Sequence, residues 1–122
     1  MLVRLVVPGP PATGNPRARG SAHRAHYRRA LHRAIRSLLV RRAIPDGPLG
    51  VRIHVVLKPS RRGDVDNIAK PILDALGELL GSDSWGRAND DRVWDLRVTK
   101  ESSDEKDESV RIEIHRIDAL VA

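Results

Sequence analysis

The chain of 122 residues contains no cysteine and no phenylalanine, and it has one tyrosine and two tryptophans. The absence of cysteine excludes disulfides, thiolate catalysis, iron–sulfur clusters and cysteine-bound zinc. With so few aromatic side chains, the base-stacking surfaces of single-strand binders are missing. No apolar run approaches the ~18 residues of a membrane span, and the N-terminal apolar stretch is too short for a signal peptide. We therefore expect a soluble, intracellular and cytoplasmic protein with no membrane partner.

Acidic residues are almost absent from the first half of the chain. Residues 1–62 contain 14 Lys and Arg but a single acid, Asp46, which gives a net charge of +13. Residues 63–122 contain 8 basic and 15 acidic residues, a net charge of −7. Arginine outnumbers lysine by 18 to 4, and arginine makes forked contacts with phosphate. A half this basic suits a polyanion such as nucleic acid, but a solvated basic surface has the same composition.

The length fits one domain that spans residues 1–122. Alternating apolar residues predict strands, and apolar residues at spacings of three and four predict helices. The strands are expected at 2–7, 51–58, 93–100 and about 110–115, and the helices at 21–42 and from about 67. The apolar side of the second helix consists of Ile68, Ile72, Leu73, Leu76, Leu79 and Leu80, and a loop that contains Gly and Ser is expected from about Gly77 to Asn89. This order, β-α-β-α-β-β, predicts an α+β domain with a mixed β-sheet and helices packed on it. The acidic segment 101–108 is interpreted as a hairpin connection, and Trp94 as a core residue of its strand.

The first helix combines an apolar stripe with a basic surface. Ser21 is a suitable N-cap. The stripe consists of Tyr27, Leu31, Ala34, Ile35, Leu38 and Leu39. The arginines that mostly lie off the stripe are Arg24, Arg28, Arg29, Arg33, Arg36 and Arg41. They either follow the phosphates of a nucleic acid or are ordinary solvated charges, and the acidity of the other half of the chain favours phosphates.

Two carboxylates precede the second helix. Pro71 is tolerated only near a helix start, because proline lacks an N–H and clashes with the carbonyl four residues back. The helix is therefore expected to begin close to Asn67, with Asp64 and Asp66 in an extended segment just before it, where alternate residues share a face. Carboxylates this close repel unless a cation offsets them, and Mg²⁺ takes oxygen ligands. Lys70 lies one helical turn beyond Asp66 and can reach the same place.

A second acidic segment, Asn89-Asp90-Asp91, adds a third carboxylate to the candidate site. Asp90 or Asp91 closes the site if the strand that begins near Arg92 lies beside the strand that ends at Lys58. Three carboxylates and a lysine in basic surroundings suit metal-assisted hydrolysis of a phosphodiester. The same residue types also form helix caps and turns, so spacing alone leaves both interpretations open.

The segment Gly63 to Leu76, with the sequence GDVDNIAKPILDAL, resembles the central motif of the RusA-type Holliday junction resolvases. That motif has Asp-x-Asp-Asn, a lysine three residues on and then Asp-Ala-Leu. The block from Asn89 to Val93, the following strand that ends at Lys100, and the Pro-rich loop with Asn15 after the first strand match as well. The resemblance covers most of the chain. Arg92 departs from it, because glutamine is common there, and the loop 77–88 is longer and more polar than usual.

The resemblance implies a homodimeric endonuclease that uses Mg²⁺, with Mn²⁺ as an alternative. It would resolve four-way DNA junctions by paired symmetric nicks in recombination and repair. The catalytic residues carried over are Asp64, Asp66, Asp90 and Lys70, and the three aspartates are also the metal ligands. Asp90 is preferred to Asp91 because the family's acid lies three residues before Val93. Such proteins are often carried by phages or prophages.

Residues that flank this site are the expected DNA contacts, namely Asn15, Arg17, Arg61, Arg62 and Lys100. Two other functions fit the sequence. One is a nuclease of the same fold that acts on other branched DNA. The other is a non-catalytic basic nucleic-acid-binding protein, which explains the basic half but gives no reason for the acidic residues and Lys70 together.

Overall fold

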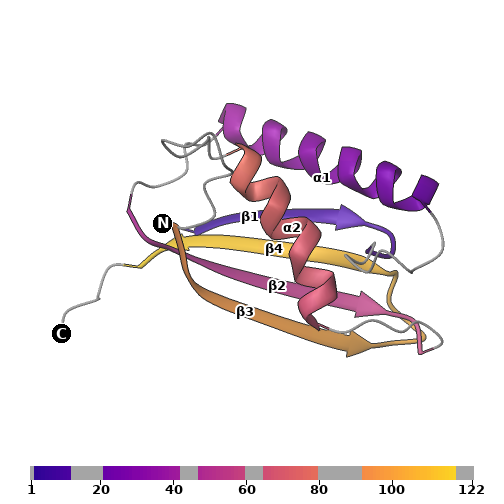
Figure 1. Cartoon of the computed structure of the whole chain (residues 1–122). Helices are drawn as coiled ribbons and strands as arrows, with labels where there is room; N and C mark the ends of the chain where they lie inside the picture. The colour runs from indigo at the N-terminus through magenta and orange to yellow at the C-terminus, as the bar shows by residue number, and fades with distance from the viewer. Residues whose placement is uncertain (1, 12–20, 42–46, 60–64, 80–91, 118–122) are drawn as a thin grey trace.

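Four strands and two helices make up the part of the chain that the computed structural model describes, which is residues 2–11, 21–41, 47–59, 65–79 and 92–117. The elements are β1 (Leu2–Pro8), α1 (Ser21–Arg41), β2 (Leu49–Leu57), α2 (Val65–Leu79), β3 (Val93–Ser102) and β4 (Ser109–Arg116). The predicted α+β class and the β-α-β-α-β-β order are confirmed (Figure 1).

The strands form one mixed sheet in the order β1-β4-β2-β3. β4 is antiparallel to both β1 and β2, whereas β2 and β3 are parallel. The prediction of a hairpin between the last two strands is wrong, because β2 lies between β3 and β4. The connection crosses the end of β2, where the N–H of Ser103 donates to the carbonyl of Leu57 at 2.9 Å. The alternation of apolar and polar residues indicates that a strand is half-buried, but it does not identify the strand that lies beside it.

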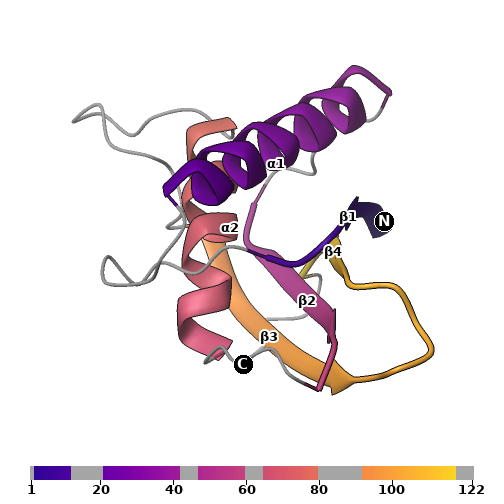
Figure 2. The same cartoon turned by 90° about the vertical axis from the view of Figure 1, so that its right-hand side faces the viewer.

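Both helices lie on one face of the sheet (Figures 1 and 2). α2 connects two parallel strands, so it must carry the chain back from the end of β2 toward the start of β3. α1 packs against α2 and β1, and α2 packs against α1 and β3. The opposite face of the sheet has no helix from the described residues on it, and most of its side chains are polar or charged.

The core between the helices and the sheet is apolar throughout the described residues, in which no polar or charged side chain is buried. The two predicted helical stripes are confirmed. Their buried members are Tyr27, Leu31, Ile35, Ile68, Ile72 and Leu76, and they meet alternate residues of the strands, namely Val3, Leu5, Val7, Val51, Ile53, Val55, Val110, Ile112 and Ile114. Burial of these faces is the main source of the stability of such elements.

α2 begins earlier than the sequence predicts, and it includes Leu79 of the predicted apolar stripe as well as Gly77, where the sequence also predicts the start of a loop. It begins at Val65, before the expected start near Asn67, and it continues through Gly77 to Leu79. Pro71 therefore lies inside the helix, where it has no N–H to donate to the carbonyl of Asn67. Helices in proteins are held mainly by tertiary packing, and the buried Ile68 and Leu76 on either side of Pro71 supply it.

Trp94 is not a core residue, because its side chain is 64% exposed. β3 is an edge strand, and its register with β2 shifts near Leu49. Leu49 pairs with Val93 and Gly50 pairs with Asp95, so Trp94 is an extra residue, a β-bulge. From Leu96 onward the pairing with β2 is regular.

Gly50 gives a test of the packing at the start of β2. It pairs with His115 of β4, whose imidazole lies where a Cβ on residue 50 would be. We expect Gly50→Ala to lower the free energy of unfolding by about 1 kcal/mol, since the ring must move. In the His115→Ala background the same substitution should lower the free energy of unfolding by a smaller amount. Urea denaturation of the wild type, the two single variants and the double variant measures this coupling. An equal loss in both backgrounds would contradict the contact.

Candidate functional site

The residues predicted to form the site are divided between described and undescribed segments. Asn15, Arg17, Arg61, Arg62, Asp64 and Asp90 lie outside the described residues, as does the alternative Asp91. Asp66 and Lys70 are in α2, and Lys100 is in β3. The geometry of the site is therefore built from these three residues and from the elements that flank the undescribed segments.

The start of α2 carries the first part of the site. Asp66 is the second residue of the helix rather than part of an extended segment before it. The argument that alternate residues share a face therefore does not apply to Asp66. Lys70 follows four residues later, which places the two positions one turn apart on the same side of the helix, and its side chain is exposed. A helix start also has unpaired N–H groups and a partial positive charge, both of which attract anions.

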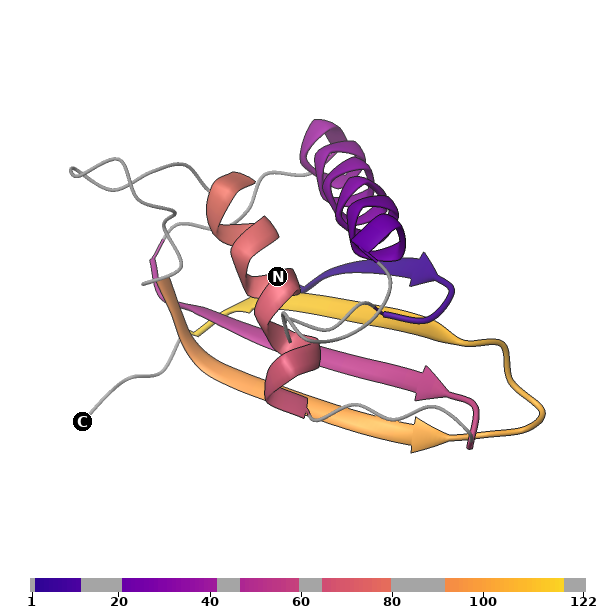
Figure 3. The same cartoon turned by 45° about the vertical axis from the view of Figure 1, so that its right-hand side comes forward.

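Lys100 lies at the same end of the molecule as the start of α2. It pairs with Val55 near the end of β2, and Val55 belongs to the face that the helices cover. In Figures 1 and 3 the start of α2 lies over the half of β3 that carries the arrowhead. Lys100 is exposed despite facing the helix side. The end of β3, which carries Lys100, and the start of α2 therefore lie toward the same end of the sheet.

The second acidic segment leads into the opposite end of β3. The strand that begins after Arg92 does lie beside β2, as expected, but the two strands are parallel, so its start lies beside Leu49 and not beside Lys58. The Arg92 guanidinium donates from Nε and Nη2 to the carbonyl of Gly47, at 3.3 and 3.2 Å. Gly47 has a φ of +88°, which suits glycine. The start of β3 therefore lies toward the opposite end of the sheet from the start of α2.

The described residues alone do not supply a metal site, since they contain no cluster of three His, Asp or Glu side chains that could hold an ion. The predicted ligands, Asp64, Asp66 and Asp90, are all carboxylates. Carboxylate oxygens are what Mg²⁺ prefers, usually with several waters retained. The donor set therefore fits Mg²⁺ in chemical type.

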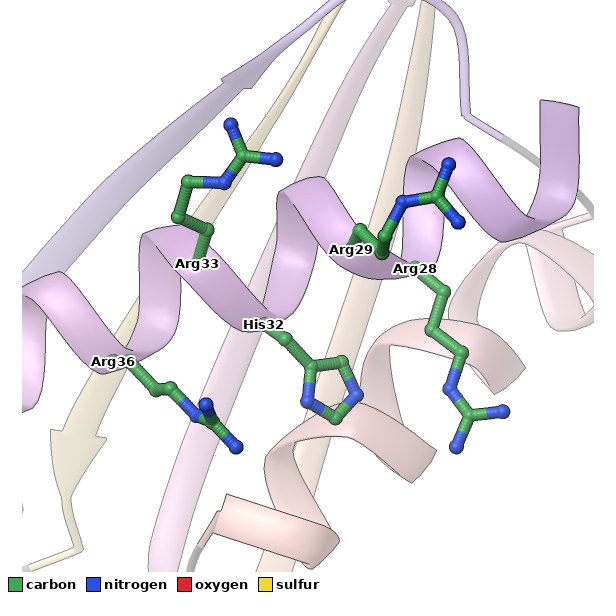
Figure 4. Close-up of a pocket in the computed structure, with 5 residues that line it drawn as sticks. All are labelled: Arg28, Arg29, His32, Arg33 and Arg36. Carbon is green, nitrogen blue, oxygen red and sulfur yellow. The ribbon is translucent and has the colours of Figure 1, made fainter.

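A basic surface covers the outer side of α1 (Figure 4). Its five residues, which we call the α1 basic face, are Arg28, Arg29, His32, Arg33 and Arg36, and they line a hollow of about 500 Å³. The four arginines are exposed. Figure 4 shows Arg28, His32 and Arg36 on the side of α1 nearer α2, and Arg29 and Arg33 on the other side. No acidic residue occurs between residues 21 and 41, so α1 itself contributes only basic charge to this surface.

Tyr27 anchors the inner side of the same helix. Its side chain is only 3% exposed, and burial raises the pKa of its hydroxyl. The ring of His23 stacks on it with centroids 6.4 Å apart. Tyr27 therefore remains neutral at physiological pH and acts as a buried support rather than as an acid or base.

The uncovered face of the sheet has charges of both signs in close pairs. Nδ1 of His54 is 2.6 Å from Oγ1 of Thr99, and its Nε2 is 3.4 Å from Glu101. Lys106 lies 2.7 Å from Glu101, and its hydrogen bond is the main reason that the pKa of that carboxyl is lowered. Arg4 and Arg111 each lie 3.4 Å from Glu113.

A hollow of about 280 Å³ on this uncovered face is lined mostly by the same paired groups. Sequence reasoning missed this network, because His54 and Thr99 are 45 residues apart and meet only through the β2–β3 register. Paired charges make this face a weaker attractor of polyanions than the α1 basic face.

Neither helix in the described part of the chain has an apolar stretch long enough to cross a membrane.

Residues 8–115 match the family described as endodeoxyribonuclease RusA. No curated protein matches the chain. The family match runs from the end of β1 to the end of β4 and includes both acidic segments and α2. It agrees with the motif at the start of α2 and extends over most of the molecule. The chain therefore belongs to the RusA family of endodeoxyribonucleases.

Proposed function

We propose that this protein is a Mg²⁺-dependent, structure-selective DNA endonuclease that resolves four-way junctions by paired symmetric nicks in recombination and repair. Family membership supports the nuclease activity. The observation that supports this site is that the first turn of α2 and the end of β3, which carries Lys100, lie toward the same end of the sheet. A DNA substrate implies that the protein acts in the cytoplasm.

The proposed roles follow from the chemistry of each side chain. Asp64, Asp66 and Asp90 would hold Mg²⁺, or Mn²⁺ in its place. When bound, the ion would lower the pKa of a coordinated water and polarise a phosphoryl oxygen. Lys70 lies one turn from Asp66, so its ammonium can offset the negative charge that develops on the phosphate during hydrolysis.

Lys100 and the start of α2 would bind the DNA backbone beside the scissile phosphate. Lys100 is exposed on the helix-covered side of β3, and the helix start has a partial positive charge. Asn15, Arg17, Arg61 and Arg62 are proposed as further contacts to the backbone. These groups position the strand but carry no direct information about its sequence.

A homodimer would match the substrate. A four-way junction has a two-fold axis, and paired symmetric nicks need two sites related by that axis. Two copies of one chain around a two-fold provide such an arrangement.

The α1 basic face supports a second contact with DNA. Four exposed arginines on two adjacent stripes of one helix, with no acid on that helix, form a local positive field. Guanidinium groups bind phosphate in a forked geometry. We infer that an arm of the junction lies along α1 and that this helix contributes affinity rather than chemistry.

The activity is tested by incubating an end-labelled four-way junction and a matching linear duplex with Mg²⁺ or with EDTA. We expect nicks at symmetric positions in the junction only, and only with Mg²⁺. Asp66→Asn should lower the cleavage rate by a factor of about 10² or more. It should leave junction binding intact or stronger, because a negative charge that faces phosphate is removed.

Asp104→Asn is the matched control, since Asp104 is an exposed aspartate in the turn between β3 and β4. It should cleave at the wild-type rate. Cleavage of the duplex, or of flaps and forks, at the same rate as the junction would contradict selectivity for four-way junctions. The protein would then be a nuclease that acts on other DNA substrates. Loss of binding in Asp66→Asn would count against the assigned role.

Metal binding is tested without activity by the melting temperature. An ion that binds the folded state stabilises it by mass action. We expect the melting temperature to rise with millimolar Mg²⁺ in the wild type and to rise less in Asp66→Asn. A flat response in the wild type would favour a basic binding protein that does not cleave.

The α1 basic face predicts a change in salt dependence. Arg29→Ala combined with Arg33→Ala should weaken junction binding and reduce the slope of log affinity against log salt by about 2, near 0.9 for each lost phosphate contact. Arg4→Ala, on the uncovered face of the sheet beside Glu113, should leave the slope unchanged. Binding titrations with cleavage blocked by EDTA measure both, and equal slopes in all variants would exclude α1 from the interface.

A further inference from the structure

The uncovered face of the sheet has a row of charged side chains that runs across all the strands. The registers of β1 with β4 and of β4 with β2 place Arg4, Glu113 and Arg52 side by side. Arg97 of β3 continues the row beside Arg52. Three arginines and one glutamate give this row a net charge of +2. We call it the arginine row.

The adjacent row on the same face adds another arginine and two polar groups. Arg111 of β4, His54 of β2 and Thr99 of β3 are in register with one another. Nδ1 of His54 lies 2.6 Å from Oγ1 of Thr99, and this contact holds the Thr99 hydroxyl in place. Both rows contribute to the hollow of about 280 Å³ on this face, which is lined by Arg52, Ile53, His54, Arg97, Thr99, Arg111 and Glu113.

The positive charge of the arginine row is only partly neutralised. Glu113 is shared between Arg4 and Arg111, each at 3.4 Å. Within the part of the chain that the structure describes, no acidic side chain lies within ion-pairing distance of Arg52. Its neighbour on β3 is Arg97, and like charges at adjacent positions of a sheet repel each other. An anion bound beside these two arginines would offset this repulsion.

Two further acids on this face lie on β3, on either side of the hollow. Asp95 is two residues before Arg97, and Glu101 is two residues after Thr99, so alternation places all four on the uncovered face. Asp95 lies 3.8 Å from Arg97, and Glu101 lies 2.7 Å from Lys106. An extended polyanion that followed β3 would meet both carboxylates, whereas a compact anion in the hollow would meet mainly arginines.

We propose that this hollow binds a small phosphate compound, of the size of inorganic phosphate or pyrophosphate. Arg52, Arg97 and Arg111 come from three adjacent strands and are exposed, so their guanidinium groups can donate to one anion. Guanidinium groups bind phosphate oxygens through forked pairs of N–H donors. The hydroxyl of Thr99 supplies a further polar group. The volume lies just below the roughly 300–1,000 Å³ of pockets that enclose whole organic ligands, which favours a compact anion.

The proposed phosphate site goes beyond the proposed nuclease function. Both helices lie on the other face of the sheet (Figure 2), so the α1 basic face and Lys70 are on the opposite side from the hollow. The nuclease proposal therefore stands or falls independently of this site. A ligand that binds the folded chain here stabilises it by mass action.

Titration of the wild-type chain with pyrophosphate, followed by NMR, tests the site. EDTA is present so that no metal ion binds the ligand elsewhere on the protein. The backbone amide resonances of Arg52, Thr99 and Arg111 should shift and saturate, and sodium chloride at equal ionic strength should not reproduce the shifts. Shifts confined to α1, or the same shifts with sodium chloride, would overturn the proposal.

Two substitutions in the hollow should change the affinity in opposite directions. Arg52→Gln should weaken pyrophosphate binding about tenfold, since a forked contact is lost. Glu113→Gln should strengthen binding about threefold, because Glu113 is the one acid among the described residues that line the hollow. A general loss of structure would not produce an increase in affinity. Equal affinity in the wild type and both variants would contradict the site.

Arg33→Gln is the matched control for charge. It removes the same charge as Arg52→Gln, but from an exposed arginine on the outer side of α1. It should leave the shifts at Thr99 and the affinity for pyrophosphate unchanged. An equal loss of affinity in Arg33→Gln and Arg52→Gln would show a response to net charge alone and would overturn the proposal.

A linear DNA duplex distinguishes a free phosphate compound from the phosphates of a DNA backbone. With EDTA present to block cleavage, the pyrophosphate shifts at Thr99 should persist when the duplex is added. Displacement of pyrophosphate by the duplex would overturn the assignment to a compact ligand. The uncovered face would then be part of the surface that binds DNA.

Discussion

Parallel pairing between β2 and β3 determines where the functional segments of the chain lie. Two parallel neighbours require the chain to return along the sheet between them, and α2 makes this return. The helix must then start near the end of β2 and finish near the start of β3. The same direction brings Lys100, late in β3, to the end of the sheet where Asp66 and Lys70 begin α2. A hairpin in place of this crossover would have put Lys100 at the other end.

The charges of the described residues are organised by surface. The uncovered face of the sheet pairs acids with bases, as at Glu113 and Glu101. The outer side of α1 has arginines and no acid. The positive field that attracts a polyanion is thus concentrated on the helical side of the molecule, where Lys70 and Lys100 also lie. This arrangement explains how a chain with a net charge of only +6 can present a strongly basic surface.

Much of the fold was predictable, because burial leaves a periodic pattern in sequence. The stripes around Leu31 and Ile72 and the alternation at Ile53 identified elements and core correctly. Strand adjacency was not predictable, since it depends on contacts between distant residues. The predicted start of α2 was wrong because tertiary packing outweighed the preference of Pro71 for a position near a helix start. The predicted burial of Trp94 was wrong because an edge strand leaves apolar side chains uncovered.

For the same reason, only part of the candidate site was predictable from the sequence. Asp66 and Lys70 are four residues apart in one helix, so their relation could be read from local spacing. Where Lys100 lies relative to them depends on the β2–β3 register, and the contact between His54 and Thr99 depends on it too. Neither relation has a signature in the sequence, because both join residues from different strands.

The bulge at Trp94 sets the phase of everything that follows in β3. Lys100 and Glu101 are adjacent, so they point to opposite faces of the sheet, the lysine toward the helices and the glutamate toward His54. If the same sequence paired with β2 without the bulge, each later side chain would exchange faces. Glu101 would then face the helices, and Lys100 would lie on the face of His54. One extra residue at the start of an edge strand therefore decides whether the helix-covered face carries a lysine or a glutamate at the end of β3.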